Sequence, residues 1–236
     1  MKLIKKVLII ALLLIAVIGA FEIYNGYSLY KETLSLSPLD EKVETITGKD
    51  NYIKKEDIPD IYFKALVAVE DRRFYTHNGF DAIGTARAVI NDIKAKKLLE
   101  GGSTITQQLA KNLYYPLDNS LERKIAEVFT AFEIERNYSK DQILELYVNC
   151  VYYGSGYYSI HDAAMGYFNK SPSQMSDFEC TLLVGIPNAP SVYSLDENPD
   201  LALERQVQVI NSMVDCEYLT QEEADKILSL QQQMQQ

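Results

Sequence analysis

The chain begins with an apolar run that predicts a membrane-spanning helix. Residues 7–21 are apolar without interruption, and three lysines precede them. This strict run is shorter than the roughly 20 residues that a spanning helix needs. The apolar residues that flank it on both sides extend it to that length, because lysine side chains at its end can reach the membrane surface. We therefore predict a transmembrane anchor over residues 7–24.

The lysines on the N-terminal side predict the orientation of this anchor. Lys2, Lys5 and Lys6 lie within residues 1–6, and positively charged flanks favour the cytoplasmic side of a membrane. The alternative is a cleaved signal peptide, for which Ile18-Gly19-Ala20 would be a poor cleavage site. With either interpretation, the remainder of the chain lies on the extracytoplasmic side of the cell membrane.

Beyond the anchor, the spacing of apolar residues predicts a mainly α-helical fold. In residues 120–137, one helix face collects Ile125, Val128, Phe129 and Phe132. Strand-like alternation is scarce. The same three- and four-residue periodicity predicts helices at residues 61–74, 140–149, 160–168, 175–186 and 201–214, and a capping box at Thr220 predicts a last one.

The distribution of polar residues predicts how the chain is divided. Residues 25–60 are polar and mixed and are interpreted as a juxtamembrane connector, residues 61–230 as the main domain, and residues 231–236 as a Gln-rich tail. The net charge of -10, from 33 acidic and 23 basic residues, argues against general nucleic-acid binding.

Cysteine usage gives no sign of a disulfide framework or a zinc site. The three cysteines, Cys150, Cys180 and Cys216, are an odd number and show no CxxC or metal-ligand spacing. Only His77 and His161 are available to join them as zinc ligands. We therefore expect buried, inert thiols.

A first candidate for chemistry is the stretch AVEDRRFYTHNGFD at residues 68–81. Glu70 ends an apolar helical run and is followed by Asp71, Arg72 and Arg73. Burial and Asp71 disfavour ionisation of the Glu70 carboxylate, whereas the two arginines favour it. Such a balance leaves a carboxylate ionised but basic enough to accept a proton near neutral pH. The alternative, which spacing alone favours, is an ordinary helix end with a solvated charge cluster.

The second candidate is the stretch GGSTITQQLAKN at residues 101–112. Two glycines supply a turn, Ser103 or Thr104 can cap the helix that follows, and Thr104 and Gln107 have the spacing of a capping box. Free N–H groups at a helix start bind anions. The motif GxxxxGK[ST] is absent, which excludes a nucleotide P-loop. Gln107, Gln108 and Lys111 share a helix face near this end. These residues are equally compatible with a helix start that is only capped and with an anion-binding site.

The third candidate is the stretch RKIAE at residues 123–127. Arg123 and Glu127 are four residues apart, on the face opposite the apolar stripe of their helix. One interpretation is a surface ion pair worth about 0.3–0.5 kcal/mol. The other is that Glu127 is a second carboxylate held among cations, where it orients a substrate or binds a metal that bridges to phosphate.

Taken in order, these stretches resemble the peptidoglycan glycosyltransferases of family 51, the transglycosylase module of class A penicillin-binding proteins. Five ordered motifs over roughly residues 60–230 carry the resemblance: EDRRFYTHNGFD (70–81), GGSTITQQLAKNLY (101–114), RKIAE (123–127), KDQILELYVN (140–149), and a distal block from YYGSGYYSIHDAA (152–164) to GIPNAPSVYS (185–194). The resemblance implies a lysozyme-like helical lobe with a smaller membrane-facing lobe. No transpeptidase domain follows, so a monofunctional member is expected.

The resemblance also implies a reaction and a set of site residues. The reaction joins lipid II units into β-1,4-linked glycan strands and releases polyprenyl pyrophosphate. Glu70 matches the base that deprotonates the attacking sugar 4-hydroxyl, and Glu127 matches a second glutamate near the donor pyrophosphate. The positions that line the donor site are matched by Ser103, Thr104, Gln107, Gln108, Lys111 and Arg123, with Lys124 as a further cation there.

The physical chemistry of the reaction agrees with this residue set. Pyrophosphate is a good leaving group, so cations and helix N–H groups can replace a general acid. Between the first two motifs, residues 89–99 alternate apolar side chains with Lys94, Lys96 and Lys97, which suits a segment that rests on anionic headgroups or a plain amphipathic helix. One departure from the family is Asn119, where members commonly carry an arginine.

The remaining expectations concern cofactors, partners and alternatives. Mg²⁺ or Mn²⁺ is a candidate cofactor, with Glu127 as the candidate ligand. The expected partners are lipid II, the nascent glycan strand, membrane lipids and proteins of cell-wall synthesis or division, and no nucleic acid. The alternative functions are a lysozyme-like enzyme that cleaves peptidoglycan and an inactive membrane-anchored scaffold.

Overall fold

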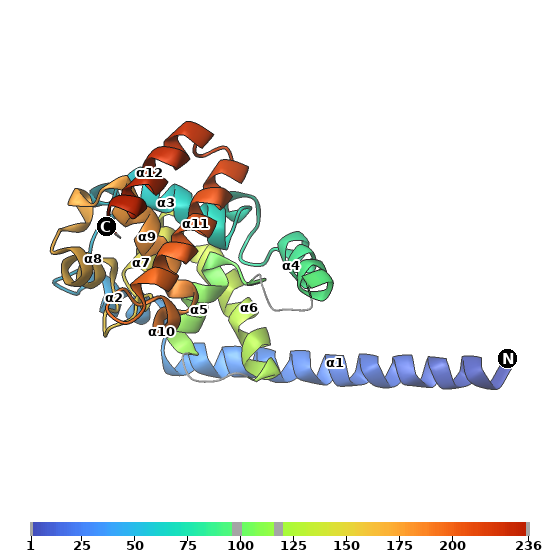
Figure 1. Cartoon of the computed structure of the whole chain (residues 1–236). Helices are drawn as coiled ribbons and strands as arrows, with labels where there is room; N and C mark the ends of the chain where they lie inside the picture. Colours follow the sequence, from blue (N-terminus) through green and yellow to red (C-terminus); the bar gives the residue numbers. More distant parts are fainter. Residues whose placement is uncertain (1, 96–100, 116–119, 235–236) are drawn as a thin grey trace.

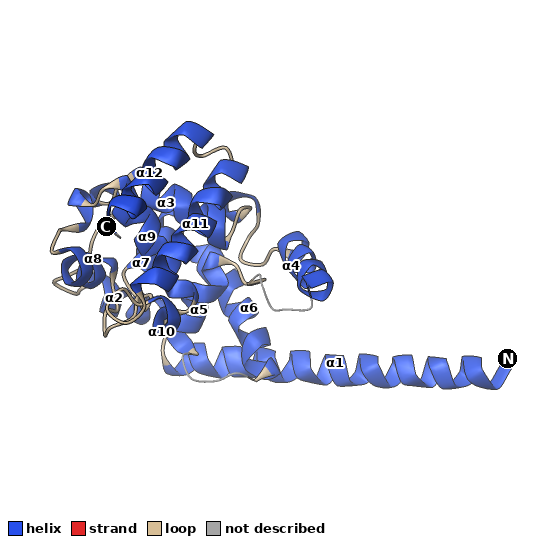
Figure 2. Cartoon of the chain, in the orientation of Figure 1, coloured by secondary structure: helices blue, strands red, loops and turns tan. Residues whose placement is uncertain are grey.

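The computed structural model describes residues 2–95, 101–115 and 120–234, and every regular element in them is helical (Figures 1 and 2). The predicted mainly α fold is therefore confirmed for this part of the chain. The helices are α1 (Lys2–Leu36), α2 (Leu39–Thr47), α3 (Asp60–Glu70), α4 (Ala82–Ala95), α5 (Ile105–Tyr114), α6 (Leu121–Asn137), α7 (Lys140–Val148), α8 (Ile160–Phe168), α9 (Asp177–Gly185), α10 (Pro190–Tyr193), α11 (Pro199–Asp215) and α12 (Gln221–Met234). Short 3-10 turns lie at Lys55–Asp57, Phe74–Thr76, Pro172–Gln174 and Ile186–Asn188.

Serine and threonine side chains fix where many of these helices begin. Ser139 accepts a hydrogen bond from the N–H of Gln142 at the start of α7, and the Gln142 side chain accepts from the N–H of Ser139. Thr220 and Glu223 exchange the same pair of bonds at the start of α12. These caps satisfy the N–H groups that a helix start leaves free. The helices predicted by periodicity begin and end within a few residues of the expected positions.

The core of the domain forms around α3, which is apolar on most of its surface. Tyr62, Leu66 and Val67 are buried there. Helices α9 and α11 pack on α3, and α5 and α7 pack on each other beside it. Gly185 in α9 allows close packing, because a Cβ atom there would lie 2.9 Å from Cγ of Arg205 in α11. Glu70 is thus placed at the edge of a rigid helical core.

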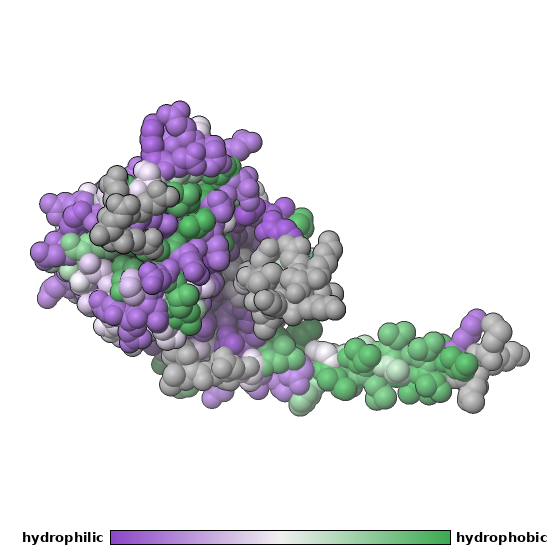
Figure 3. All heavy atoms as spheres, in the orientation of Figure 1, coloured by the Kyte–Doolittle hydropathy of each residue, from purple (hydrophilic) through white to green (hydrophobic). Residues whose placement is uncertain are grey.

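Helix α1 is long and apolar enough to cross a membrane. It is one continuous helix, and the most apolar window of 18 residues within Ile4–Leu36 has a mean hydropathy of 2.7 (Figures 1 and 3). With a rise of about 1.5 Å per residue, its 35 residues extend roughly 50 Å, well beyond a hydrocarbon core of about 30 Å. The N-terminal part projects with exposed apolar side chains, and the C-terminal part lies against the domain.

The segment predicted as a connector is largely helical and packed. Helix α1 continues through it to residue 36, where Tyr27 and Tyr30 contact the ring of Phe129 in α6 and the Tyr30 hydroxyl donates to Glu133. Leu39 and Ile46 of α2 are part of the buried core. Ile125 and Phe129 of the apolar stripe predicted on α6 therefore pack against α1, whereas Phe132 is exposed. The opposite face of α6 is buried in the domain.

Helix α4 lies apart from the other helices, on the side toward which α1 projects (Figure 1). Ile83 and Ile90 are exposed on it, and the Thr85 hydroxyl connects it to the domain by donating to the carbonyl of Gly102 (3.0 Å). Most of the segment predicted to rest on lipid headgroups lies outside the described residues or side chains, and Asn119 lies outside them too.

Candidate active site

Glu70 is the last residue of α3, and its side chain is 9% exposed. Its Oε2 atom accepts a hydrogen bond from Nε2 of Gln108 in α5 (2.7 Å), and its Oε1 atom lies 3.5 Å from a guanidinium nitrogen of Arg205 in α11. Arg205 is a site residue that the sequence did not reveal, because 135 residues separate it from Glu70 and its local pattern is that of an ordinary amphipathic helix.

The carboxylate of Glu70 faces a cleft of about 540 Å³. Arginines dominate its polar lining, which also includes neutral hydrogen-bonding side chains. Besides Glu70, its polar side chains are those of Arg72, Arg87, Arg205, Asp215, Asn188, Gln208 and Ser212, and Asp215 is paired with Arg72. A proton acceptor among fixed positive charges suits a substrate that carries both a hydroxyl group and negative charge.

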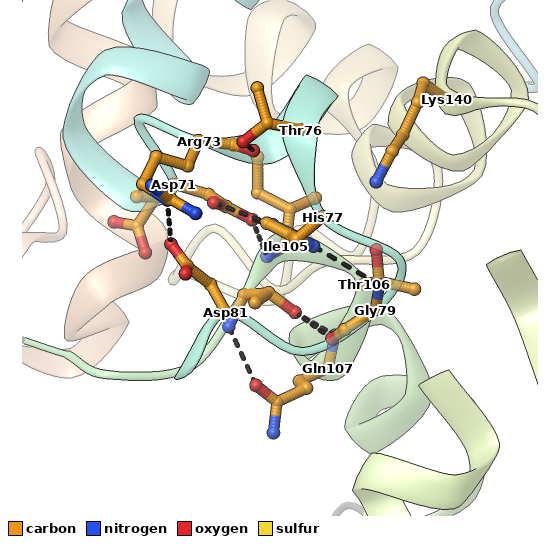
Figure 4. Close-up of polar contacts among 12 residues, drawn as sticks. Asp71, Arg73, Thr76, His77, Gly79, Asp81, Ile105, Thr106, Gln107 and Lys140 are labelled. Carbon is orange, nitrogen blue, oxygen red and sulfur yellow. Dashed lines mark hydrogen bonds and ion pairs between the residues drawn. The ribbon is translucent and has the colours of Figure 1, made fainter. Parts of the chain in front are cut away.

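The residues that follow Glu70 fasten this segment to the start of α5 (Figure 4). Asp71 Oδ2 accepts from the N–H of Ile105, the first residue of α5 (3.1 Å), and lies 2.9 Å from Nε2 of His77. The N–H of Gly79 donates to Nδ1 of His77 (3.2 Å), so the proton of this imidazole is on Nε2, which donates to Asp71. Thr104 donates its hydroxyl to the carbonyl of Gly79 (2.7 Å). The first two motifs therefore form one hydrogen-bonded unit.

The arginines next to Glu70 are paired with other carboxylates. Arg73 donates to Asp81 (3.0 Å), and Arg72 lies 3.3 Å from Asp215. Burial tends to raise the pKa of Asp81, but the N–H groups of Gly84 and Ile83 together with Arg73 bring it below its usual value. Among the described residues, the cation that directly contacts the Glu70 carboxylate is therefore Arg205, from a distant helix, and not Arg72 or Arg73.

The capping box predicted at the start of α5 is confirmed. The N–H of Gln107 donates to the Thr104 hydroxyl and the N–H of Thr104 donates to the Gln107 side chain, each at 3.1 Å. Both side chains are buried, and both are used to cap the helix start. The N–H groups of Ile105 and Gln107 are also taken by protein acceptors. These two N–H groups are therefore not free to bind an anion, and the anion-site interpretation of this helix start stays a prediction.

Glu127 is the centre of a buried charge cluster on α6. Its carboxylate, 1% exposed, accepts from Arg123 through Oε2 and from Lys124 through Oε1. Lys124 also donates to the Ser103 hydroxyl (2.6 Å). The interpretation of Arg123 and Glu127 as a surface ion pair is therefore wrong, because the face of α6 that carries them is the one that packs into the domain.

The start of α5 connects the two carboxylates. Ser103 contacts the Lys124–Glu127 cluster, and Gln108, in the second turn, contacts Glu70. Lys111, one turn further, is exposed, and its side chain makes no hydrogen bond or ion pair with the residues that the structure describes. The predicted site residues therefore assemble along one helix, with the candidate base at one side and the cations at the other.

The donor set at Glu127 does not fit a protein-held Mg²⁺ or Mn²⁺. Both of its oxygens accept from cations. Among the described residues, no group of three or more His, Cys, Asp or Glu side chains is arranged to hold a metal ion. Hard cations of this kind bind where several oxygen ligands converge.

Of the three thiols that were expected to be buried and inert, Cys180 is buried, whereas Cys150 and Cys216 are half-buried. Burial raises the pKa of Cys150 and of Cys180 to about 12. Burial also raises the pKa of Cys216, with smaller contributions from Arg72, which lowers it, and Asp215. All three thiols are free and stay protonated near neutral pH.

Comparisons with known proteins agree with this arrangement. Residues 40–214 match the family model described as Transglycosylase. Penicillin-binding protein 1F of Bacillus subtilis (strain 168) is 43% identical over 185 residues, which are 78% of this chain and 26% of that protein. Penicillin-binding protein 1A of Aquifex aeolicus (strain VF5) is 41% identical over 178 residues, which are 75% of this chain and 24% of that protein.

A solved relative is penicillin-binding protein 1A from Haemophilus influenzae, whose crystal structure matches with a TM-score of 0.45 and 22% identity over 75% of this chain and 17% of that chain. The chain spans about a quarter of the length of the curated relatives named above. The family match begins at residue 40, inside the segment predicted as a connector, and covers the motifs at Glu70, Ser103 and Glu127. The resemblance seen in the sequence is thus confirmed, and the chain belongs to the transglycosylase family.

Proposed function

We propose that the protein is a membrane-anchored peptidoglycan glycosyltransferase. It polymerises lipid II into β-1,4-linked glycan strands and releases polyprenyl pyrophosphate. The observation that carries the proposal is the placement of Glu70 in an arginine-lined cleft, joined through the start of α5 to the cations around Glu127.

Glu70 acts as the general base. Its carboxylate accepts the proton of the acceptor sugar 4-hydroxyl while that oxygen forms a bond to the anomeric carbon of the donor. The bond from this carbon to the pyrophosphate oxygen breaks on the opposite face, so the configuration inverts. The leaving pyrophosphate keeps the electron pair of the broken bond.

The cations on the far side of α5 stabilise the charge that the leaving group acquires. Lys124 and Arg123 are held by Glu127, and Lys111 is exposed and available to a phosphate oxygen. Because both oxygens of Glu127 are engaged, its role is to orient these cations rather than to move a proton. Preoriented charge of this kind stabilises a transition state without reorganisation.

The anchor explains how the enzyme meets its substrates. Lipid II and the growing strand both carry a polyprenyl chain and stay in the membrane, and α1 keeps the cleft beside it. The lysines before the apolar run favour a cytoplasmic N-terminus, which leaves the catalytic domain extracytoplasmic. Proteins of cell-wall synthesis or division are further proposed partners.

The test is a lipid II polymerisation assay with purified full-length protein and its Glu70→Gln variant. Loss of the base is expected to lower the rate by about 10²- to 10⁴-fold without unfolding the protein. Glu222→Gln is the matched control, because that side chain is 79% exposed in α12. Full polymerisation by Glu70→Gln would contradict the assignment, and release of muropeptides from sacculi would indicate a cleaving enzyme instead.

A further inference from the structure

Behind Glu70, two hydrogen bonds lead into the protein core. The hydroxyl of Tyr147 in α7 donates to Oε1 of Gln108 (3.0 Å). Nε2 of Gln108 in α5 donates to Oε2 of Glu70 (2.7 Å). The three residues come from three different helices, and the motif that contains Tyr147 has no part in the chemistry described above.

The direction of both bonds is fixed by the chemistry of the groups. Tyr147 is fully buried, and burial raises the pKa of its phenol well above the usual value, with the Glu70 carboxylate acting in the same direction. The phenol therefore keeps its proton and donates it to the amide oxygen of Gln108. The NH₂ group of Gln108 is then turned toward Glu70, whose Oε2 atom accepts from it.

This arrangement makes the two oxygens of Glu70 unequal. Oε2 is held by Gln108 at 2.7 Å, whereas Oε1 has a longer contact of 3.5 Å with Arg205, which lines the cleft. Oε1 is thus the oxygen on the cleft side and the one with the weaker protein contact. A base must present a free lone pair to the hydroxyl that it deprotonates, within hydrogen-bond distance.

We propose that Tyr147 is a positioning residue for the glycosyl transfer: by fixing the amide of Gln108, it holds Oε2 of Glu70 and presents Oε1 to the acceptor hydroxyl. The inference rests on the proposed function, in which Glu70 is the base. Tyr147 touches no substrate and acts only through Gln108.

A second buried tyrosine pair supplies the matched control. The hydroxyls of Tyr62 and Tyr153 lie 2.7 Å apart, and both side chains are fully buried. In the described part of the chain, Tyr153 makes no hydrogen bond to Gln108 or Glu70. Tyr153→Phe therefore removes a buried phenol hydrogen bond from the same core without touching the Tyr147–Gln108–Glu70 chain.

The kinetic test is a double-mutant cycle on full-length protein in detergent, with lipid II as substrate. Gln108→Leu is expected to lower kcat by about 10- to 100-fold, because it removes a hydrogen bond to a charged group. Tyr147→Phe is expected to lower kcat roughly 5- to 20-fold with KM changed less than about 2-fold. In the Gln108→Leu background, Tyr147→Phe is expected to cost less than about 2-fold more.

Three kinetic results would overturn the proposal. They are an unchanged kcat in Gln108→Leu, an unchanged kcat in Tyr147→Phe, and independent, additive losses in the double variant. Tyr153→Phe is expected to retain wild-type kcat, and a loss in that variant as large as in Tyr147→Phe would show that any buried phenol matters equally. Thermal unfolding of all variants separates these effects from loss of folding.

A structural readout tests the inference independently of activity. Crystal structures of the wild-type chain and of Tyr147→Phe are compared at the Gln108–Glu70 contact. The wild type is expected to keep Nε2 and Oε2 within hydrogen-bond distance, whereas in Tyr147→Phe the Gln108 amide turns or the contact is lost. An unchanged, singly occupied contact in Tyr147→Phe would overturn the positioning role. An inactive wild type with this structural change would contradict the proposed function, and would support only the structural part of the inference, that Tyr147 fixes the Gln108–Glu70 contact.

Discussion

Removing the charge of Glu127 is expected to destabilise the protein strongly, because it leaves buried cations without their partner. In Glu127→Gln, Arg123 and Lys124 lose the carboxylate that accepts from both. Breaking a buried ion pair on one side costs about 3–5 kcal/mol. The Lys124 side chain is 38% exposed and can turn to water, whereas the Arg123 side chain is 10% exposed and cannot. We therefore expect the lower end of this range, about 3 kcal/mol.

Thermal unfolding followed by circular dichroism measures this loss. For a chain of this size, 1 kcal/mol corresponds to about 2–4 °C in Tm, so Glu127→Gln is expected to unfold roughly 6–12 °C below the wild type. Glu222→Gln is the control, because the Glu222–Lys226 pair in α12 is exposed, with 79% and 70% of the side chains accessible. A pair of this kind contributes less than about 1 kcal/mol.

A double variant tests the cause of the effect. Arg123→Met together with Glu127→Leu removes both buried charges, and apolar replacement of a buried pair is often neutral or stabilising. We expect this double variant to unfold at a higher temperature than Glu127→Gln alone. The reasoning is refuted if Glu127→Gln is no less stable than Glu222→Gln, since the cluster would then behave like a solvated surface pair.

Two further predictions concern the anchor and the region near Glu70. Gly26→Leu is expected to lower the free energy of unfolding by about 1–3 kcal/mol, and with it Tm, because a Cβ atom at Gly26 would lie 2.5 Å from Ile125. Gly19→Leu is the control and is expected to be neutral, since no atom lies within 4 Å of a Cβ atom at that position. The Asp81 pKa is lowered in the folded protein, so its contribution to stability is present above the ordinary carboxyl pKa of 3.8 and is lost as pH falls through the folded value. Tm measured against pH is expected to fall less steeply below about pH 4 in Asp81→Asn than in the wild type, and equal slopes would contradict this role.

Local signals in the sequence predicted the helices and several of their starts. The capping pairs at Thr104 and Thr220 depend on side chains three residues apart, and such contacts form within one helical turn. The helix predicted over residues 61–74 ends earlier, at Glu70, where the apolar run stops and charged residues follow. Contacts between residues within one helical turn can therefore be predicted from the sequence.

Contacts between distant helices were not predictable in the same way. Nothing in the spacing of α6 shows that α1 covers its apolar stripe and that the face with Glu127 is the buried one. Arg205 in α11 contacts Glu70, and Tyr147 in α7 contacts Gln108, which in turn contacts Glu70; each has the local pattern of an ordinary helix. The role of Asp71 at the N–H of Ile105 likewise depends on a tertiary contact.

The unbroken passage of α1 from its apolar part to its contact with α6 has a mechanical consequence. A continuous helix that packs on the domain is a rigid connection and not a flexible linker. The domain therefore does not rotate freely relative to the apolar part of α1. Each residue added to α1 between its apolar part and its contact with α6 would move the domain by about 1.5 Å along the helix axis. It would also turn the domain by roughly 100° about that axis, relative to the apolar part. The height of the cleft above the bilayer, and the side of it that meets a passing lipid, are thereby encoded in the length of a single helix.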